Sequence, residues 1–237
     1  MAHRIVVPFE LPDATPISRL LIEDLAGMEV VLLGHYNLPE QTPPDAARTQ
    51  FEEEAQAELD ALAQDFIEAD IDVTKRLIFG KDRDKAIDQV AIEEDCDSEL
   101  DPAPTDGIER ILVPMLDTSN IDRMCYFVSL LCEDTTNEVT LFHVVEPGED
   151  RAEVEAMLES GREQMIGDSF DPGLVDIAIT EAEEHDAEIL RMAEDYDAVV
   201  MSEVDPSVSG RIFGTLADKI ANRTGDPVII VRKEADQ

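Results

Sequence analysis

Apolar residues in this chain form short runs, separated by longer stretches that carry an apolar stripe at intervals of three and four residues. A short apolar run is typical of a strand buried on both faces, whereas such a stripe is typical of an amphipathic helix. In the second half, the runs predict strands at 110–114, 138–145, 175–180, 197–201 and 227–232. The stripes predict helices at 121–132, 149–165, 187–193 and 214–222. This alternation indicates a parallel sheet with helices on both faces.

The first half follows the same pattern only part of the way. It predicts strands at 4–8, 29–35 and 71–79, and helices at 15–25, 43–68 and 82–92. The next segment, 96–107, contains Pro102 and Pro104, and proline has no N–H to donate to a neighbouring strand. We therefore expect at most a short or edge strand there, and no counterpart of the last helix and strand of the second half.

Three short sequences occur twice in the same order. Residues 3–8 match 109–114, residues 29–33 match 138–142, and residues 95–98 match 195–198. The copies lie about 100 residues apart, which is the size of a domain rather than of a solenoid repeat. The sequence thus predicts an α/β protein of two tandem open parallel-sheet, nucleotide-binding-like domains. Residues 1–106 form the first, truncated domain, and residues 107–237 form the complete second one.

Acidic residues dominate the charge of the chain. There are 56 of them against 18 basic residues, which gives a formal net charge of −38, and 43% of the residues are apolar. The apolar runs can build a core, so the acidic residues are expected on a folded surface and not in a disordered chain. Such a surface repels itself at low salt and is screened at molar salt, where the Debye length is about 3 Å. We interpret the chain as adapted to a salt-rich cytoplasm of the halophilic kind.

Charge and cysteine content also bear on partners and compartment. Nucleic acid is not an expected partner, because phosphate binding needs a basic stripe, and an anionic membrane would repel the same surface. Cys96, Cys125 and Cys132 lack paired short spacing, which predicts buried thiols and neither disulfides nor a zinc site. The sequence predicts no signal peptide and no membrane-spanning stretch, so we expect a cytoplasmic protein.

Ligands of open parallel sheets bind beyond the carboxyl ends of the strands, where the strand order reverses. In the second half, this places residues 114–119 and 201–215 at a candidate site. Gly214 and Thr215, at the start of a predicted helix, offer backbone N–H groups and a hydroxyl, which are the parts of an anion site. The alternative is that Gly210 and Gly214 only shape a tight connection and that Thr215 caps the helix.

At these segments the chain resembles the universal stress protein family, as a tandem pair. The resemblance rests on the opening Ile-Leu-Val-Pro strand, the strand ending in His143-Val144-Val145, the strand 197–201, the loop to Gly214-Thr215 and the closing strand 227–232. It implies a five-stranded parallel sheet flanked by helices. ATP-binding members of the family carry Gly-x2-Gly-x9-Gly-(Ser/Thr) after the fourth strand, and only the final Gly214-Thr215 is present here.

The resemblance also implies a set of candidate nucleotide-binding residues. They are Pro114, Asp117 and Val144 at the adenosine end, and Met201, Ser202, Gly210, Arg211, Gly214 and Thr215 at the phosphate end. Ser202 and Asp205 replace glycines, and side chains there hinder the approach of backbone to phosphate. Glu203 and Asp205 add carboxylates near the phosphates, offset by Arg211. We therefore expect ATP or another adenine nucleotide to bind weakly or not at all, and assign no cofactor.

No catalytic or metal-binding pattern emerges from the sequence. The four histidines are scattered along the chain, at His3, His35, His143 and His185. Because His143 lies within a predicted strand, we interpret it as a packed or hydrogen-bonded residue and not as a catalytic base. Nucleophile-elbow, Walker and metal-ligand spacings are missing from the sequence.

Three functional hypotheses follow. The leading one is a non-enzymatic stress or regulatory module that works through contacts with a protein partner. The second is an adenine-nucleotide sensor in which Gly210, Gly214 and Thr215 hold the phosphates. The third is an enzyme of the nucleotide alpha-hydrolase superfamily, for which the sequence offers no catalytic residue.

The closing strand at 227–232 also suggests how the protein assembles. It contains consecutive apolar residues, and the first half has no equivalent strand to pair with it. Because an uncovered apolar edge strand promotes aggregation, we expect two chains to pair through this strand in a two-fold homodimer. The competing possibility is that the first domain covers it.

Overall fold

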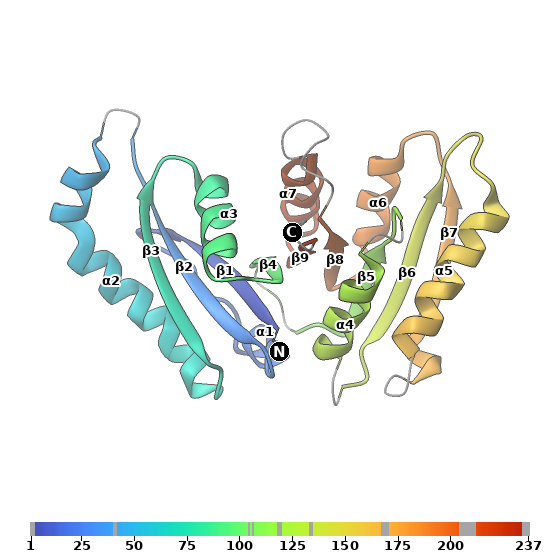
Figure 1. Cartoon of the computed structure of the whole chain (residues 1–237), viewed down its shortest axis with the longest axis horizontal. Coiled ribbons are helices and arrows are strands. Elements are labelled where there is room, and N and C mark those ends of the chain that lie inside the picture. The colour runs from blue at the N-terminus through green and yellow to red at the C-terminus, as the bar shows by residue number, and fades with distance from the viewer. Residues whose placement is uncertain are drawn as a thin grey trace. The chain divides into compact units, whose positions relative to one another are not determined.

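The computed structural model describes residues 3–39, 42–103, 105, 107–117, 120–132, 135–166, 171–203 and 212–233. The chain divides into two compact units, residues 1–102 and residues 103–237. Their helices and strands are drawn in Figure 1. Each unit is an α/β structure with its own run of parallel strand pairs, which confirms the predicted fold class.

The first unit has four strands and three helices among its described residues. In chain order they are β1 (Arg4–Leu11), α1 (Arg19–Asp24), β2 (Glu29–Asn37), α2 (Pro44–Glu68), β3 (Val73–Gly80), α3 (Arg83–Glu93) and β4 (Ser98–Asp101). The strand order is β3-β2-β1-β4, and all pairs are parallel. The described residues between 102 and 107 contain no further strand or helix, which confirms the predicted truncation.

The second unit carries the complete pattern. Its elements are β5 (Arg110–Pro114), α4 (Ile121–Leu131), β6 (Glu138–Val145), α5 (Arg151–Ile166), a 3-10 turn (Pro172–Leu174), β7 (Val175–Glu181), α6 (His185–Ala193), β8 (Ala198–Ser202), α7 (Ile212–Thr224) and β9 (Val228–Val231). The strand order is β9-β8-β5-β6-β7, again with parallel pairs. The five predicted strands are therefore confirmed.

Some element ends differ from the prediction for identifiable reasons. Strand β1 continues past Pro8 and pairs with β2 as far as Leu11, because proline removes only a single donor from the ladder. Helix α1 begins at Arg19 and not at residue 15, since the Ser18 hydroxyl accepts a hydrogen bond from the Leu21 N–H at 3.1 Å and so caps the helix there. Helix α7 begins at Ile212, ahead of the predicted start at Gly214.

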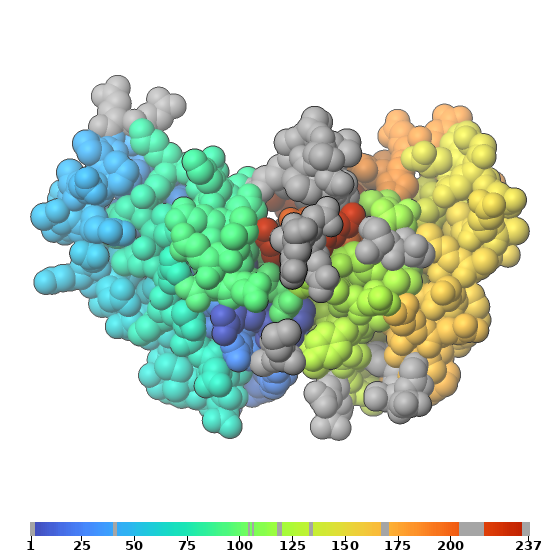
Figure 2. Space-filling model, viewed as in Figure 1, coloured from blue at the N-terminus to red at the C-terminus, as the bar shows by residue number. Residues whose placement is uncertain are grey.

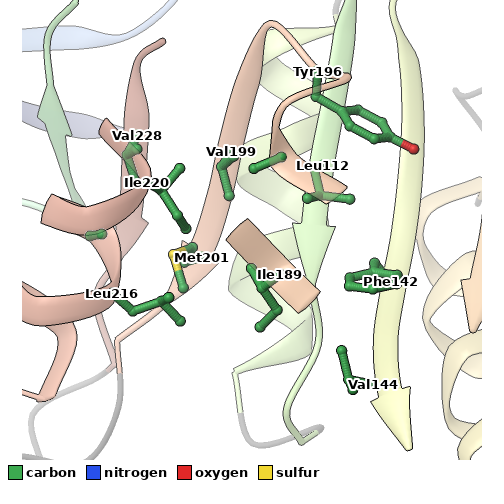
Figure 3. Close-up of a cluster of buried hydrophobic side chains, with 12 residues drawn as sticks. Leu112, Phe142, Val144, Ile189, Tyr196, Val199, Met201, Leu216, Ile220 and Val228 are labelled. Carbon is green, nitrogen blue, oxygen red and sulfur yellow. The ribbon is translucent and has the colours of Figure 1, made fainter. Parts of the chain in front are cut away.

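A buried apolar cluster lies between the second unit's sheet and helices α6 and α7 (Figure 3). Phe142, Val144 and Met201 from the sheet pack there with Ile189 and Ile220 from the two helices. These side chains are at most 2% exposed. A separate cluster in the first unit packs α3 against β1 and β2. Each unit thus has its own core.

Acidic side chains cover the outer surfaces of the long helices. On α5, drawn in yellow in Figure 2, they include Glu153, Glu155, Glu159 and Glu163, all exposed. On α2 the consecutive residues Glu52, Glu53 and Glu54 are exposed as well. Acidic side chains therefore lie on the surface of a folded chain, as the composition predicts.

The repeated sequences form matching contacts at the edge where the strands begin. In the first unit, the Asp97 carboxylate accepts the Arg4 N–H at 3.0 Å, and the Arg4 guanidinium pairs with Glu29. In the second unit, Asp197 accepts the Arg110 N–H at 2.8 Å, and the Arg110 guanidinium lies 4.0 Å from Glu138. The repeated residues therefore make equivalent contacts in the two units.

Candidate functional site

The strand order of the second unit reverses at β5, which lies between β8 and β6. Its candidate site is therefore the carboxyl ends of β5 and β8. Pro114 ends β5, and Met201 and Ser202 end β8. The structure thus brings these three predicted residues to one edge of the sheet, with Val144 near the end of the neighbouring strand β6.

The side chains of Val144 and Met201 are 0% and 2% exposed and belong to the cluster under α6 and α7 (Figure 3). In this structure they contribute to the core, so only their backbone could contact a ligand. Asp117 is exposed beyond the end of β5. Gly214 and Thr215 lie in the first turn of α7, whereas Gly210 and Arg211 lie outside the described residues.

Glu203 follows β8, where the sequence suggests repulsion of phosphate. Its N–H donates to the Val231 carbonyl at 2.8 Å, and its carboxylate accepts the Lys233 N–H at 3.0 Å. The same carboxylate lies 3.7 Å from the Arg232 guanidinium. Val231 ends β9, and Arg232 and Lys233 follow it. Strand β9 lies on the side of β8 away from β5. The expected repulsion by Glu203 is therefore smaller than the sequence indicates, because an arginine faces this carboxylate.

Asn120 also contacts this edge. Asn120 lies directly before α4, but its side chain makes no capping hydrogen bond. Its amide instead donates to the Val231 carbonyl at 3.1 Å and to the Arg232 carbonyl at 3.4 Å. The amide therefore joins the start of α4 to the end of β9, a contact that the local sequence pattern does not reveal.

A buried histidine connects the loops that follow β5 and β6. His143 Nδ1 lies 2.5 Å from the Met115 carbonyl oxygen, and Nε2 lies 3.1 Å and 3.2 Å from the two oxygens of Glu149. The His185 ring, at the start of α6, is 6.5 Å away centre to centre in an edge-on arrangement. The prediction of a hydrogen-bonded histidine is confirmed, but sequence reasoning missed its partners Glu149 and His185.

The corresponding edge of the first unit is filled by apolar side chains. Leu11 lies against Gly34, where an added Cβ would come within 2.8 Å of the Leu11 Cδ1 atom. Tyr36 stacks between Phe51 and Phe79, at ring-centre distances of 5.4 Å and 5.0 Å. The missing side chain at Gly34 thus allows Leu11 to pack against β2.

His35 lies at this edge of the first unit, 1% exposed, and neither of its ring nitrogens has a hydrogen-bond partner. Burial lowers the pKa of His35 below its ordinary value, with Arg83 acting in the same direction and Glu10 and Asp82 opposing it. The unfolded chain therefore binds this proton more readily than the folded one. The contribution of the neutral His35 ring to the free energy of unfolding is complete above about pH 6.5, the pKa of histidine in an unfolded chain. It is lost as pH falls through the lower pKa of His35 in the folded protein.

We expect the wild-type protein to lose stability relative to His35→Leu as pH falls from about 7.5 to about 5, because leucine removes the buried proton-binding group. Urea unfolding in molar KCl at each pH measures the difference. Parallel stability curves for the two proteins would contradict this expectation.

A Ser–His–Asp contact occurs at the opposite edge of the first unit, where β1 and β4 begin. His3 Nε2 lies 3.1 Å from the Ser98 hydroxyl, and Nδ1 lies 3.5 Å from the Asp97 carboxylate. Ser98 is 0% exposed, so a substrate carbonyl cannot reach its hydroxyl. This arrangement therefore supports the fold and does not form a nucleophilic site.

The described part of the chain offers neither a metal site nor a membrane span. It contains no group of three or more His, Cys, Asp or Glu side chains placed to hold a metal ion. Its helices are too short or too polar to cross a membrane. Cys96, Cys125 and Cys132 are buried, as predicted, and burial raises the pKa of the Cys125 thiol to about 12.

The model of the universal stress protein family matches residues 107–232, which is more than half of the chain. The chain belongs to this family. Its matched region includes the whole of the second unit from β5 to β9. No curated protein matches the sequence of this universal stress protein.

Solved structures resemble this universal stress protein over nearly its full length. A universal stress protein from Archaeoglobus fulgidus is 19% identical, with a TM-score of 0.67, and the match covers 99% of this chain and 97% of that one. A putative universal stress protein from Pseudomonas aeruginosa is 16% identical, with a TM-score of 0.55 and coverage of 98% and 93%. The cytoplasmic domain of a prokaryotic cation chloride cotransporter is 15% identical, with a TM-score of 0.54 and coverage of 97% and 95%. At these identities the similarity shows the fold alone.

Proposed function

We propose that this universal stress protein is a non-enzymatic regulatory module that works through protein contacts and does not require a bound nucleotide. The observation that carries the proposal is the end of β8, where Glu203 pairs with Arg232 and binds the backbone after β9. A phosphate at the ends of β5 and β8 would meet the Glu203 carboxylate, whereas the guanidinium paired with that carboxylate lies on the side of β8 away from β5. The buried side chains of Val144 and Met201 add to this argument, because they are unavailable to adenosine.

An adenine-nucleotide sensor is the second candidate. It is favoured by Gly214 and Thr215 in the first turn of α7, where backbone N–H groups and the helix dipole attract anions. Calorimetry with ATP, ADP and AMP at molar KCl separates the two candidates. Weak or absent binding supports the protein-contact module, whereas micromolar binding by the native protein supports the sensor.

The double substitution Ser202→Gly with Asp205→Gly is expected to strengthen ATP binding by about ten-fold or more, since each 1.4 kcal/mol of relieved repulsion and crowding gives a factor of ten. Asp205 lies outside the described residues, so this expectation rests on the sequence. Calorimetry on Asp205→Asn, which keeps the size and removes the charge, separates repulsion from crowding. Unchanged affinity in the double variant would contradict the prediction.

The proposed partner is a protein, because a net charge of −38 disfavours nucleic acid and anionic membranes. We also propose that two chains form a homodimer through residues 227–232. The alternative is that the first domain of the same chain covers this strand. Ile229 is 0% exposed within the chain, so a lysine there would unfold the second unit. Assembly is therefore better tested on the native chain.

Light scattering at molar KCl over a range of concentrations is expected to give twice the mass of one chain, because the apolar strand needs a partner. A mass equal to one chain at every concentration would reject the homodimer and favour cover by the first domain.

A further inference from the structure

Basic residues are concentrated in one segment of the first unit. Residues 75–85 contain five of the 18 basic residues and two acidic ones, so this segment is locally positive in a chain of net charge −38. Two of the five lie on β3 and pair with carboxylates of α2 and α3. The other three, Lys81, Arg83 and Lys85, lie at the start of α3. Cations therefore gather at this helix start in a largely acidic protein.

The start of α3 also has backbone groups that attract anions. The helix is 11 residues long, and its first turn directs N–H groups and the positive end of the helix dipole away from the helix. Two nearby carboxylates have partners: Asp82 accepts the Lys85 N–H at 3.0 Å, and Asp101 accepts from the Arg83 guanidinium at 2.9 Å. Asp84, in the first turn, opposes an anion. The helix start thus offers donors and cations, and a buried donor lies next to them.

That buried donor is His35, which lies beneath the start of α3. In β2, Val31 and Leu33 pack against α3, and His35 follows on the same face of the strand. Its ring is 1% exposed, and neither nitrogen has a hydrogen-bond partner among the described residues. A Cβ built on Gly80 would lie 3.3 Å from Nε2, so this nitrogen faces the backbone of the loop that leads into α3. Buried polar groups in native proteins nearly always have a partner, and an exception points to a bound water or ligand.

We propose that a phosphate-type oxyanion binds at the start of α3, between the His35 ring and the three cations Lys81, Arg83 and Lys85. A neutral imidazole has a single N–H, which Nε2 can donate to an anion oxygen. The other oxygens accept from the first-turn N–H groups and from the ammonium groups of the lysines. Gly80 has no side chain and so allows the anion to approach the backbone closely. The inference is independent of the proposed function, because that function rests on the end of β8 in the second unit.

The charges around this site allow an anion to bind in spite of the net charge of the chain. At molar salt the Debye length is about 3 Å, so distant carboxylates are screened and only adjacent groups act. Glu10 pairs in register with His35, but on the β1 side of β2, whereas Gly80 lies on the β3 side. The Glu10 carboxylate also accepts the Asn37 amide at 3.1 Å. A water molecule would satisfy the ring as well, but it would not neutralise the cations.

Titration of the full chain with inorganic phosphate, followed by NMR, tests the proposal. Molar potassium glutamate replaces KCl, because chloride competes for the same donors. The amide signals of residues 81–85 and the Nε2 signal of His35 should shift together and saturate at the same phosphate concentration. Glycerol phosphate, titrated in parallel, separates two sources of the anion. Tighter binding of the ester assigns the site to a phosphorylated small molecule, whereas equal or weaker binding assigns it to free phosphate, and either result supports the site.

Three variants locate the anion. Because Gly80 does not have a positive φ, Gly80→Ala fits the backbone but places a methyl group 3.3 Å from Nε2, and it should weaken phosphate binding by about ten-fold or more. Lys85→Gln removes a cation near the helix start and should weaken binding by about two- to five-fold. Lys219→Gln is the matched control: it removes a lysine of α7 that pairs with Asp186, and it should bind phosphate as the wild type does.

The absence of a saturable shift at residues 81–85 would overturn the proposal and leave water as the partner of His35. Wild-type affinity in both Gly80→Ala and Lys85→Gln would overturn it as well. If circular dichroism shows that Gly80→Ala does not fold, Lys85→Gln decides alone. Saturable shifts at the ends of β5 and β8, in place of residues 81–85, would also overturn it and would support the nucleotide sensor instead.

Discussion

Raising KCl from about 0.1 M to about 2 M should raise the melting temperature of the protein by about 10 °C or more. The net charge is −38, and the acidic residues of α2 and α5 lie exposed on folded helices. The Debye length falls from about 10 Å at 0.1 M to about 3 Å at 1 M, so repulsion between neighbouring carboxylates is screened. A gain of a few kcal/mol corresponds to this shift, because about 1 kcal/mol moves the midpoint of a chain of this size by about 2–4 °C.

Differential scanning calorimetry across a KCl series measures the effect. Sucrose at matched osmolality is the control, since it is excluded from the protein surface but screens no charge. A melting temperature that stays flat or falls as KCl rises would rule out the halophilic interpretation of the composition.

The substitution Phe142→Ala is expected to destabilise the second unit by about 3–5 kcal/mol, the range for removing a buried aromatic ring from a core. Phe142 is 0% exposed and lies in the cluster between the sheet and α6 (Figure 3). Urea unfolding in molar KCl, followed by circular dichroism, gives the change in the free energy of unfolding.

Two further variants show whether that loss is specific. Tyr126→Ala removes a ring that is 50% exposed on α4 and should cost well under half as much. Phe66→Ala removes a ring that is 1% exposed in α2 of the first unit. If the units unfold separately, Phe142→Ala and Phe66→Ala will shift different transitions. A small effect of Phe142→Ala in every transition would show that the ring is not packed as the structure has it.

The sequence predicts strands better than it predicts helix ends. Strands such as 110–114 and 138–145 are nearly continuous apolar runs, because parallel strands are covered on both faces, and the structure has them at the same bounds. The start of α1 depends instead on the Ser18 hydroxyl, and an apolar stripe carries no information about that hydrogen bond. The truncation of the first unit was predictable because proline acts locally on the ladder.

The sequence predicts a candidate site at the ends of β5 and β8 but not the contacts that its residues make. Its position follows from the strand order, because ligands of open parallel sheets bind where that order reverses. The contacts that decide its chemistry join residues far apart in sequence, such as Glu203 with Arg232 and Asn120 with Val231. Glu149 lies closer to its partner His143, but the loop between them has no period that predicts the contact. Such contacts depend on tertiary packing, and a one-dimensional pattern does not encode them.

The equivalent contacts where the strands begin also mean that, during folding, a strand could pair with the wrong copy of the repeat. Both copies offer an aspartate to the first strand of a sheet, Asp97 in one and Asp197 in the other, so β1 could form a crossed pair with β8. The residue after Asp97 is Ser98, which contacts the buried His3 ring at 3.1 Å, whereas Asp197 is followed by Ala198. Crossed pairing would leave His3 without its hydroxyl partner, at a cost of about 1–3 kcal/mol. The His3–Ser98 contact, which has no counterpart at Ala198, therefore favours the pairing of β1 with β4.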